Sequence, residues 1–123
     1  VLALTGKITQ AGEKIFASNG KNVDFVSALK SCEETGATLA APMNEEENTA
    51  ILDIVKKYNQ YAYLGIKESE TAGKFNYLNG MPLNYTKWYY REPSGKEKCV
   101  EMYTDGSWND RRCDVYRLTV CEF

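Results

Sequence analysis

Apolar positions recur with two different periods along this 123-residue chain, a helical one in its first half and a strand-like one in its second. At the start, the spacing between apolar residues alternates between three and four. The positions concerned are Val1, Leu4, Ile8, Ala11 and Ile15. This is the a/d pattern of a coiled coil, although Gly6 and Gly12 weaken it. The pattern predicts a helix over residues 1–13, which is either packed on its own domain or the end of a longer oligomeric neck.

After this segment the pattern predicts a strand, a turn and a helix, at 14–17, 18–21 and 24–34 respectively. Gly36 is a good C-terminal stop for the helix. The apolar face of the helix consists of Phe25, Ala28, Leu29 and Cys32. Cys32 is therefore expected to face the core, where it can meet a distant strand.

A second helix is expected to begin after Asn44. Asn44 is a suitable N-cap, and Glu47 is placed to complete a capping box. Three acids in the first turn and Lys56 and Lys57 in the last turn match the helix dipole. The buried stripe is predicted to be Ile51, Ile54, Val55 and Tyr58. Capping explains the acidic cluster better than a metal site does.

From residue 61 onward the pattern becomes that of strands. Strands are predicted at 61–66, 75–78, 100–103, 107–109 and 115–122, with turns at 79–80 and 104–106. In the last strand, Tyr116, Leu118 and Val120 are expected on one face. Residues 81–98 show neither period, and a long irregular loop inside a compact domain is usually functional. Helices followed by strands predict one α+β domain with an antiparallel sheet.

Four cysteines, at positions 32, 99, 113 and 121, form no CxxC pair, so a zinc ribbon or a redox motif is not expected. Their even number favours two disulfides and a secreted, extracellular protein. Three pairings are possible. Cys99 and Cys113 flank one hairpin, so their pairing closes a local loop, and Cys32–Cys121 then ties the first helix to the last strand. The sequon at Asn84 agrees with secretion.

Charge and composition exclude several classes of function. The formal net charge is −2, and no basic block interleaved with aromatic residues suggests nucleic acid binding. The chain has no histidine, which excludes an imidazole base and a His-ligated zinc. With no free cysteine expected and no paired acid–base motif, an enzyme is not expected. No run approaches the roughly 18 apolar residues of a membrane helix.

The stretch from Glu92 to Asp110 carries the candidate chemistry. It holds hard oxygen ligands at high density, namely Glu92, Glu97, Asn109 and Asp110, close to Cys99 and Cys113. Ca²⁺ takes six to eight oxygen ligands and tolerates irregular geometry. The stretch therefore predicts a Ca²⁺ site.

Several motifs in order give the chain, over Lys14–Phe123, a resemblance to the C-type lectin domain, and within that family to the collectins. The motifs are Tyr63-Leu64-Gly65-Ile66, Glu92-Pro93-Ser94, Trp108-Asn109-Asp110, the four cysteines and Val120-Cys121-Glu122-Phe123. The resemblance implies the C-type lectin fold, α+β with two helices, antiparallel sheets and a long irregular Ca²⁺-binding loop region. It also implies that residues 1–13 end a coiled-coil neck that forms a homotrimer, and that residues 14–123 are the carbohydrate-recognition domain.

The resemblance also implies a site and a mechanism. Glu92, Ser94, Glu97, Asn109 and Asp110 would bind one Ca²⁺ and, with it, the vicinal hydroxyls of a sugar. Carboxylates would accept the hydroxyl protons and the Asn109 amide would donate to the hydroxyl oxygens. Glutamate at position 92 resembles mannose-type members, since galactose-type members carry Gln and Asp at positions 92 and 94. The Glu92–Pro93 bond is expected to be cis.

Two departures from the family pattern affect this site. Ser94 stands where most members have Asn, and only four residues separate Glu92 from Glu97. For a second Ca²⁺ site, Glu68 could supply one ligand, but Ala72 and Lys98 occupy positions where acids are needed. We therefore predict one primary Ca²⁺, with an affinity of roughly 10⁻⁴–10⁻³ M.

Three functions remain open from the sequence. The first is a Ca²⁺-dependent lectin for mannose-type glycans. The second, implied by the resemblance to surfactant collectins, is binding of phospholipid or lipid A, with Tyr116, Arg117 and the aromatic segment 88–91 as candidates. Core packing is the simpler explanation for Trp88. The third is a domain of this family that has lost sugar binding and contacts proteins.

Overall fold

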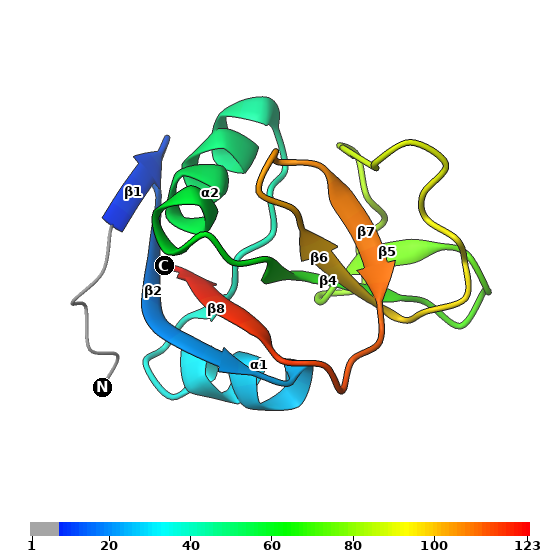
Figure 1. Cartoon of the computed structure of the whole chain (residues 1–123), viewed down its shortest axis with the longest axis horizontal. Coiled ribbons are helices and arrows are strands. Elements are labelled where there is room, and N and C mark those ends of the chain that lie inside the picture. Colours follow the sequence, from blue (N-terminus) through cyan, green and yellow to red (C-terminus); the bar gives the residue numbers. More distant parts are fainter. Residues whose placement is uncertain (1–7) are drawn as a thin grey trace.

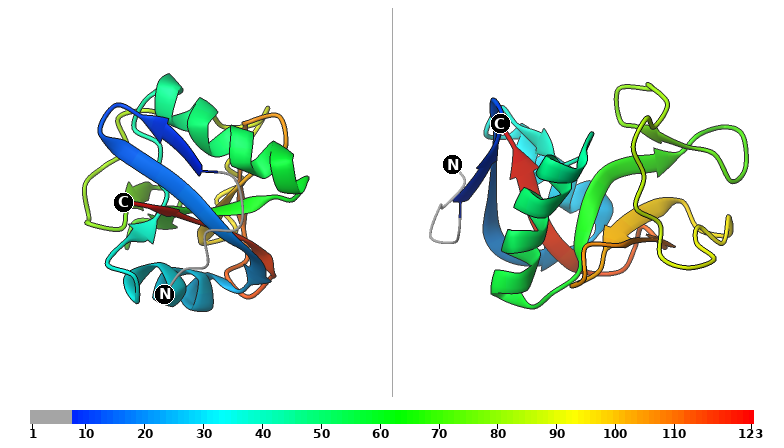
Figure 2. Two further views of the ribbon diagram at one scale, coloured as in Figure 1. Left: turned by 90° about the vertical axis from the view of Figure 1, so that its left-hand side faces the viewer. Right: turned by 90° about the horizontal axis from the view of Figure 1, so that it is seen from above.

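The computed structural model describes residues 8–123, which form two helices and one extended sheet. The helices are α1 (Phe25–Glu33) and α2 (Glu45–Tyr58). The strands are β1 (Ile8–Ala11), β2 (Lys14–Val23), β3 (Thr38–Leu39), β4 (Ala62–Glu68), β5 (Phe75–Tyr77), β6 (Cys99–Met102), β7 (Trp108–Arg111) and β8 (Arg117–Glu122). The helices lie on opposite sides of β2 and β8, while the irregular loop after β5 lies at the end of the molecule away from β1 (Figures 1 and 2). No helix in this part of the chain combines the length and apolar character needed to cross a membrane.

The sheet has the strand order β1-β2-β8-β4-β6-β7, with β3 added to β8 and β5 added to β4. Every pairing is antiparallel except β4 with β8, which is parallel. The predicted α+β class is confirmed, with the sheet mixed at this one pair. The central strand β4 carries the Tyr63-Leu64-Gly65-Ile66 motif, whose residues are buried.

Gly65 has a steric reason to be glycine. A Cβ atom added there would lie 2.6 Å from the backbone oxygen of Leu39, and the Gly65 N–H donates to the Ala40 oxygen at 2.8 Å. The chain passes too close to β4 at this point for any side chain. The motif therefore lets the β3 segment close over the sheet.

The predicted helix over residues 1–13 is wrong where the structure describes it. Residues 8–11 form β1, which pairs with β2 through a turn at Gly12, whose φ is +59°. Ile8 and Ile15, two residues of the predicted stripe, are exposed, while Ala11 is buried. Strand pairing within the domain overrides a weak two-heptad signal. Residues 1–7 of the predicted neck lie outside the described residues, so the division at residue 13 stays a prediction.

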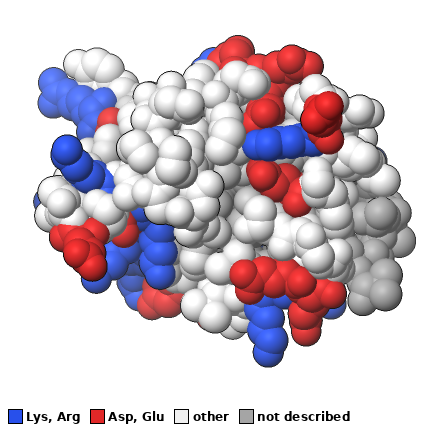
Figure 3. Space-filling model, turned by 180° about the vertical axis from the view of Figure 1, so that it is seen from behind, with Lys and Arg blue, Asp and Glu red and all other residues white. Residues whose placement is uncertain are grey.

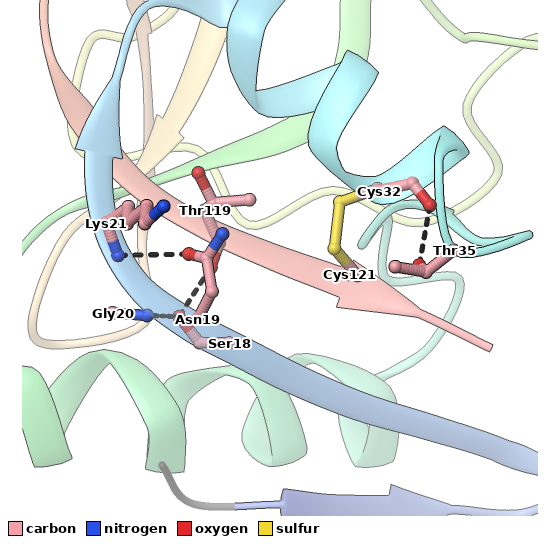
Figure 4. Close-up of a disulfide and its surroundings, with 8 residues drawn as sticks. All are labelled: Ser18, Asn19, Gly20, Lys21, Cys32, Thr35, Thr119 and Cys121. Atoms are coloured by element: carbon pink, nitrogen blue, oxygen red, sulfur yellow. Dashed lines mark hydrogen bonds between the residues drawn. A yellow bond between two sulfur atoms is a disulfide. The ribbon is translucent and has the colours of Figure 1, made fainter. Parts of the chain in front are cut away.

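The predicted turn at 18–21 is also wrong, because these residues lie inside β2. The register with β8 shifts between Ser18 and Asn22, so the segment is a bulge. The Ser18 hydroxyl donates to the Thr119 carbonyl and accepts from the Gly20 N–H (Figure 4). Side-chain hydrogen bonds here replace those of a regular ladder.

Both helices begin as the sequence predicts. The Asp24 side chain accepts from the Ser27 N–H, and Asn44 accepts from the Glu47 N–H at 2.8 Å. The Glu47 carboxylate reaches back to the Met43 N–H rather than to Asn44, and also pairs with Lys14. Glu47 therefore acts in the cap, as predicted, while Glu45 of the same turn pairs with Lys87.

Both predicted disulfides are present, Cys32–Cys121 and Cys99–Cys113, and the described residues include no free cysteine. The first joins α1 to β8 at the centre of the smaller core cluster (Figure 4). The second lies beside the hairpin of β6 and β7, which carries the candidate site. The larger core cluster fills the space between α2 and the sheet.

Candidate functional site

The site is built around Asp110, a buried carboxylate in β7 that holds the loop at residues 94–97. The backbone N–H of Ser94 donates to Oδ1 at 2.9 Å. The Ser94 hydroxyl, at 2.7 Å, and the N–H groups of Gly95 and Glu97, at 3.1 and 3.2 Å, donate to Oδ2. Gly95 makes the turn possible with a φ of +78°. One carboxylate thus shapes the whole short loop.

Glu92 lies close to Asp110, so the site holds two neighbouring carboxyl groups with no cationic partner among the contacts of the described residues. Burial, a hydrogen bond with Asp110 and the negative charge of that residue all raise the pKa of Glu92. Burial alone would raise the pKa of Asp110 too, but hydrogen bonds from Ser94, Glu97 and Glu92 bring that pKa below its ordinary value. One oxygen of Glu92, Oε1, is buried without a hydrogen-bond partner in the described structure. The Glu92–Pro93 bond is cis, as expected.

Asn109 precedes Asp110 in β7 and is also buried. Its Nδ2 donates to Oε2 of Glu101 at 2.9 Å. Glu101 was missed by the sequence reasoning. Its signal was an acid within the apolar strand Val100–Met102, directly across the hairpin from Asn109.

Of the five predicted metal ligands, the structure places the Ser94 side chain against Asp110, and Glu92 close enough to Asp110 for that residue to raise the pKa of Glu92. Glu97 joins them through its backbone N–H, and its carboxylate is close enough to contribute to the raised pKa of Glu92. Ser94 is directed at Asp110 as a hydrogen-bond donor, a role that the sequence reasoning did not consider.

These residues fit a hard cation. Within residues 8–123, no group of three or more Asp, Glu or Cys side chains is arranged to hold a metal ion by itself. A cation here would need the Asn109 amide oxygen as well as carboxylates, which is a donor set that suits Ca²⁺. The unpartnered oxygen of Glu92 beside a second carboxylate is what a bound cation would neutralise.

The position considered for a second Ca²⁺ is occupied by turn contacts. Glu68, at the end of β4, accepts from the Gly73 N–H through its carboxylate at 2.9 Å. Its own backbone N–H donates to the Lys98 carbonyl at 2.8 Å. Glu68 thus has a structural role in closing the turn after β4.

The candidate lipid-contacting residues differ in exposure. Tyr116 is 69% exposed and lies before β8, so the expectation that it shares a face with Leu118 and Val120 is wrong. Arg117 is half-buried, pairs with Glu101 and lies over the Tyr61 ring at 5.8 Å. A surface hollow of about 340 Å³ includes Tyr61, Tyr116 and Arg117 in its lining.

The aromatic segment 88–91 divides into a packed and an exposed part. Trp88 packs edge-on against Trp108 and contacts Phe75, so the core-packing explanation is confirmed for it. Tyr90 is 76% exposed. Asn84, the residue of the sequon, is exposed, and its Oδ1 accepts a hydrogen bond from the Tyr77 hydroxyl.

Basic side chains gather toward the loop end of the molecule on its rear face (Figure 3). A hollow of about 320 Å³ lies beside the Cys99–Cys113 disulfide. Its lining includes Lys96, Lys98 and Arg112, together with Glu97 and Asp114. Arg112 is paired with Asp114 at 2.7 Å, which leaves two lysines and one glutamate and gives this lining a small positive excess.

Solved structures with the same fold include both sugar-binding and other proteins. The chain is similar to the mouse scavenger receptor C-type lectin carbohydrate-recognition domain, with 24% identity, a TM-score of 0.86, and coverage of 94% of this chain and 92% of that one. It is similar to the cow C-type carbohydrate-recognition domain of CD23 in the presence of a GlcNAc2Man3 oligosaccharide (22%, 0.84, 94% and 92%). It is also similar to a calcium-independent type II antifreeze protein (24%, 0.84, 100% and 95%).

At these identities the similar structures establish the fold, and they include a protein described as calcium-independent. The family follows from a separate match. The model of the lectin C-type domain matches residues 21–123, which is most of the chain and includes every candidate residue of the site. The chain belongs to the C-type lectin domain family.

Proposed function

We propose that this chain is a Ca²⁺-dependent lectin that binds mannose-type sugars. Domains of its family are binding modules rather than enzymes, and two disulfides agree with a secreted, extracellular setting. The observation that carries the proposal is the buried, unpartnered Oε1 of Glu92, next to the carboxylate of Asp110. A pair of acids in this condition requires either a shared proton or a cation.

The side chains of the site have separate roles in sugar recognition. A bound Ca²⁺ would supply positions for two vicinal hydroxyls. Glu92 and Glu97 would accept the hydroxyl protons, and the second N–H of the Asn109 amide remains to donate to a hydroxyl oxygen, since the first is used by Glu101. The order of acceptors and donors then selects the diol geometry. Asp110 would maintain the loop through its hydrogen bonds with Ser94, Gly95 and Glu97.

The sequence motifs favour a finer assignment to the collectins, and among these to the surfactant protein A type, acting in innate immune recognition at airway or mucosal surfaces. Such a chain would form homotrimers through a coiled-coil neck that ends before β1. A single small, exposed sugar site binds weakly, so trimerisation would supply avidity for microbial glycans.

The experiment is retention on a mannose matrix in Ca²⁺ and elution by EDTA. Glu97→Gln removes a ligand charge while leaving intact the backbone N–H that Asp110 needs. We expect this variant to lose Ca²⁺-dependent retention. Glu33→Gln, an exposed acid at the end of α1, is the matched control and should be retained like the wild type. Retention of the wild type in EDTA, or equal retention of Glu97→Gln, would contradict the proposal.

Selectivity is tested at position 94. Ser94→Asn restores the residue common in the family, and we expect stronger binding to mannose on a glycan array in Ca²⁺. Ser94 also donates to Asp110, so the unfolding of the variant in EDTA is measured in parallel. A stably folded variant with no gain toward mannose shows that position 94 does not limit binding.

A second candidate function is binding to phospholipid or lipid A. The exposed Tyr116 beside the hollow that Arg117 lines favours it. Flotation with phosphatidylcholine vesicles or with lipid A vesicles tests this, using Tyr116→Ala, with Val26→Ala on α1 as an equally exposed control (69%). A loss specific to Tyr116→Ala supports lipid contact. Failure to bind both sugar and vesicles would favour a domain that contacts proteins.

A further inference from the structure

Glu101 is a buried charge whose position is unexplained by the ligand set proposed above. It lies in β6, is 2% exposed, and is paired directly across the hairpin with Asn109 in β7. Both of its oxygens are engaged. Oε2 accepts from Nδ2 of Asn109 at 2.9 Å, and Oε1 accepts from Nε of Arg117. A buried carboxylate is costly unless it is paired and hydrogen-bonded in this way.

The chemistry of this contact determines which way the Asn109 amide faces. An ionised carboxylate only accepts hydrogen bonds, so Asn109 must present its nitrogen to Glu101. The amide group is planar, with its oxygen on the side away from the nitrogen that Glu101 binds. An unconstrained asparagine can present either atom, and only the oxygen can ligate a cation.

We propose that Glu101 is a positioning residue of the Ca²⁺ site, which it completes by directing the Asn109 oxygen toward the cation. This inference rests on the proposed function, because it concerns the same site. Arg117 contributes by fixing the other oxygen of Glu101, so that the carboxylate cannot turn away from Asn109. The ion pair between Glu101 and Arg117 is thus part of the site, although neither residue touches the cation.

The test reverses the polarity of the contact without changing its shape. In Glu101→Gln, the amide oxygen is expected to face the charged Arg117, which donates only. The new amide nitrogen then faces Asn109, which must turn its oxygen inward and its nitrogen toward the cation. We expect the Ca²⁺ dissociation constant, measured by isothermal titration calorimetry, to rise at least about tenfold, which corresponds to the loss of roughly one ligand.

A second change should repair the first. Adding Asn109→Asp to Glu101→Gln gives the new amide nitrogen an acceptor and returns an oxygen to the cation. The double variant has the same net charge as the wild type, so electrostatics alone predicts no difference between them. We expect its Ca²⁺ affinity to recover to within a few-fold of the wild-type value.

Two measurements are made on the Ca²⁺-free protein and do not require Ca²⁺ binding. The side-chain amide signal of Asn109 in ¹⁵N-correlated spectra of the Ca²⁺-free protein should shift in Glu101→Gln, because its hydrogen-bond acceptor is lost. Thermal unfolding in EDTA reports any general loss of stability. A purely structural role for Glu101 would lower the unfolding temperature, and the Asn109→Asp change would not restore Ca²⁺ affinity.

Asn109→Asp alone keeps the inference testable if Glu101→Gln folds poorly. It adds a negative charge, which should strengthen Ca²⁺ binding if charge decides. By our argument it brings a second carboxylate against Glu101 and weakens binding. Tighter binding by Asn109→Asp, or wild-type affinity in folded Glu101→Gln, would overturn the inference. A wild-type chain that binds no Ca²⁺ would instead refute the proposed function, and the Asn109 signal would still report the contact.

Discussion

Asp110→Asn tests whether Asp110 holds the loop in the absence of any metal. The carboxylate accepts four hydrogen bonds from residues 94–97, divided between one donor on Oδ1 and three on Oδ2. An asparagine has a single acceptor oxygen in the same volume. Its best orientation places that oxygen among the three donors and its nitrogen opposite the Ser94 N–H. One hydrogen bond is then lost, and the other three are made to a neutral acceptor instead of a charged one.

The magnitude follows from these four contacts. A hydrogen bond to a charged group contributes about 1.5–3 kcal/mol, and a neutral one about 0.5–1.5 kcal/mol. Losing one such bond and weakening three by about 1–1.5 kcal/mol each gives roughly 7 kcal/mol as an upper value. Two effects reduce this: the loop is partly exposed, so its N–H groups regain water, and the repulsion with Glu92 disappears. We expect a net loss of about 2 kcal/mol in the free energy of unfolding.

The assay is urea unfolding in EDTA. With a slope of about 1.5 kcal/mol per M, the midpoint should fall by about 1.3 M. Asp53→Asn, an exposed acid on α2, is the control and should stay within about 0.5 kcal/mol of the wild type. A Ca²⁺-free Asp110→Asn variant that unfolds at the wild-type midpoint would refute the claim that this carboxylate shapes the loop.

Three further predictions concern stability. Replacing both cysteines of the Cys32–Cys121 bridge by alanine should cost about 4.6 kcal/mol, since the bridge closes a loop with a sequence separation of 89 residues; denaturant unfolding measures it, and a loss below about 1 kcal/mol would contradict the loop-closure argument. Asn44→Ala should cost about 1 kcal/mol through loss of the N-cap of α2, seen in thermal unfolding, while an unchanged midpoint would show that the cap is dispensable. Burial raises the pKa of Glu122 despite its contacts with Ala41 and Lys14. The folded state therefore binds the Glu122 proton more tightly than the unfolded state does. Stability accordingly falls as pH rises from the unfolded-state pKa through the folded-state pKa. Glu122→Gln should lack this fall above the ordinary pKa of glutamate, and parallel curves for both proteins would contradict the assignment.

Local signals explain what the sequence predicted well. The cap at Asn44, the acids of the first turn and the final lysines all act within one helix, so α2 could be predicted almost to the residue. The hairpin of β6 and β7 likewise depends on a turn and two short strands. The disulfides followed from the predicted positions of these elements. Each of these features depends on neighbouring residues or on a single long-range link.

The errors occur where strand pairing decides the structure, through a short hairpin in one case and through a distant strand in the other. Residues 8–11 carry a helical spacing, but the turn at Gly12 and the free edge of β2 make them a strand. Residues 18–21 have the composition of a turn, but β8 pairs on both sides of them and leaves a bulge. Neither β8 nor the edge of β2 can be recognised as a partner from the local pattern.

The candidate site divides in the same way. Sequence motifs predicted which residues could supply oxygen atoms to a cation. They did not predict which of these side-chain atoms are already used in hydrogen bonds within the protein. The structure commits Ser94 to Asp110 and the Asn109 nitrogen to Glu101. A cation here would therefore meet one partly used carboxylate, one unpartnered oxygen on Glu92 and one amide whose orientation depends on a residue behind it. Ca²⁺ affinity in this chain should accordingly be more sensitive to Glu101, whose two oxygens are engaged by Asn109 and Arg117, than to the exposed acids of the surrounding surface.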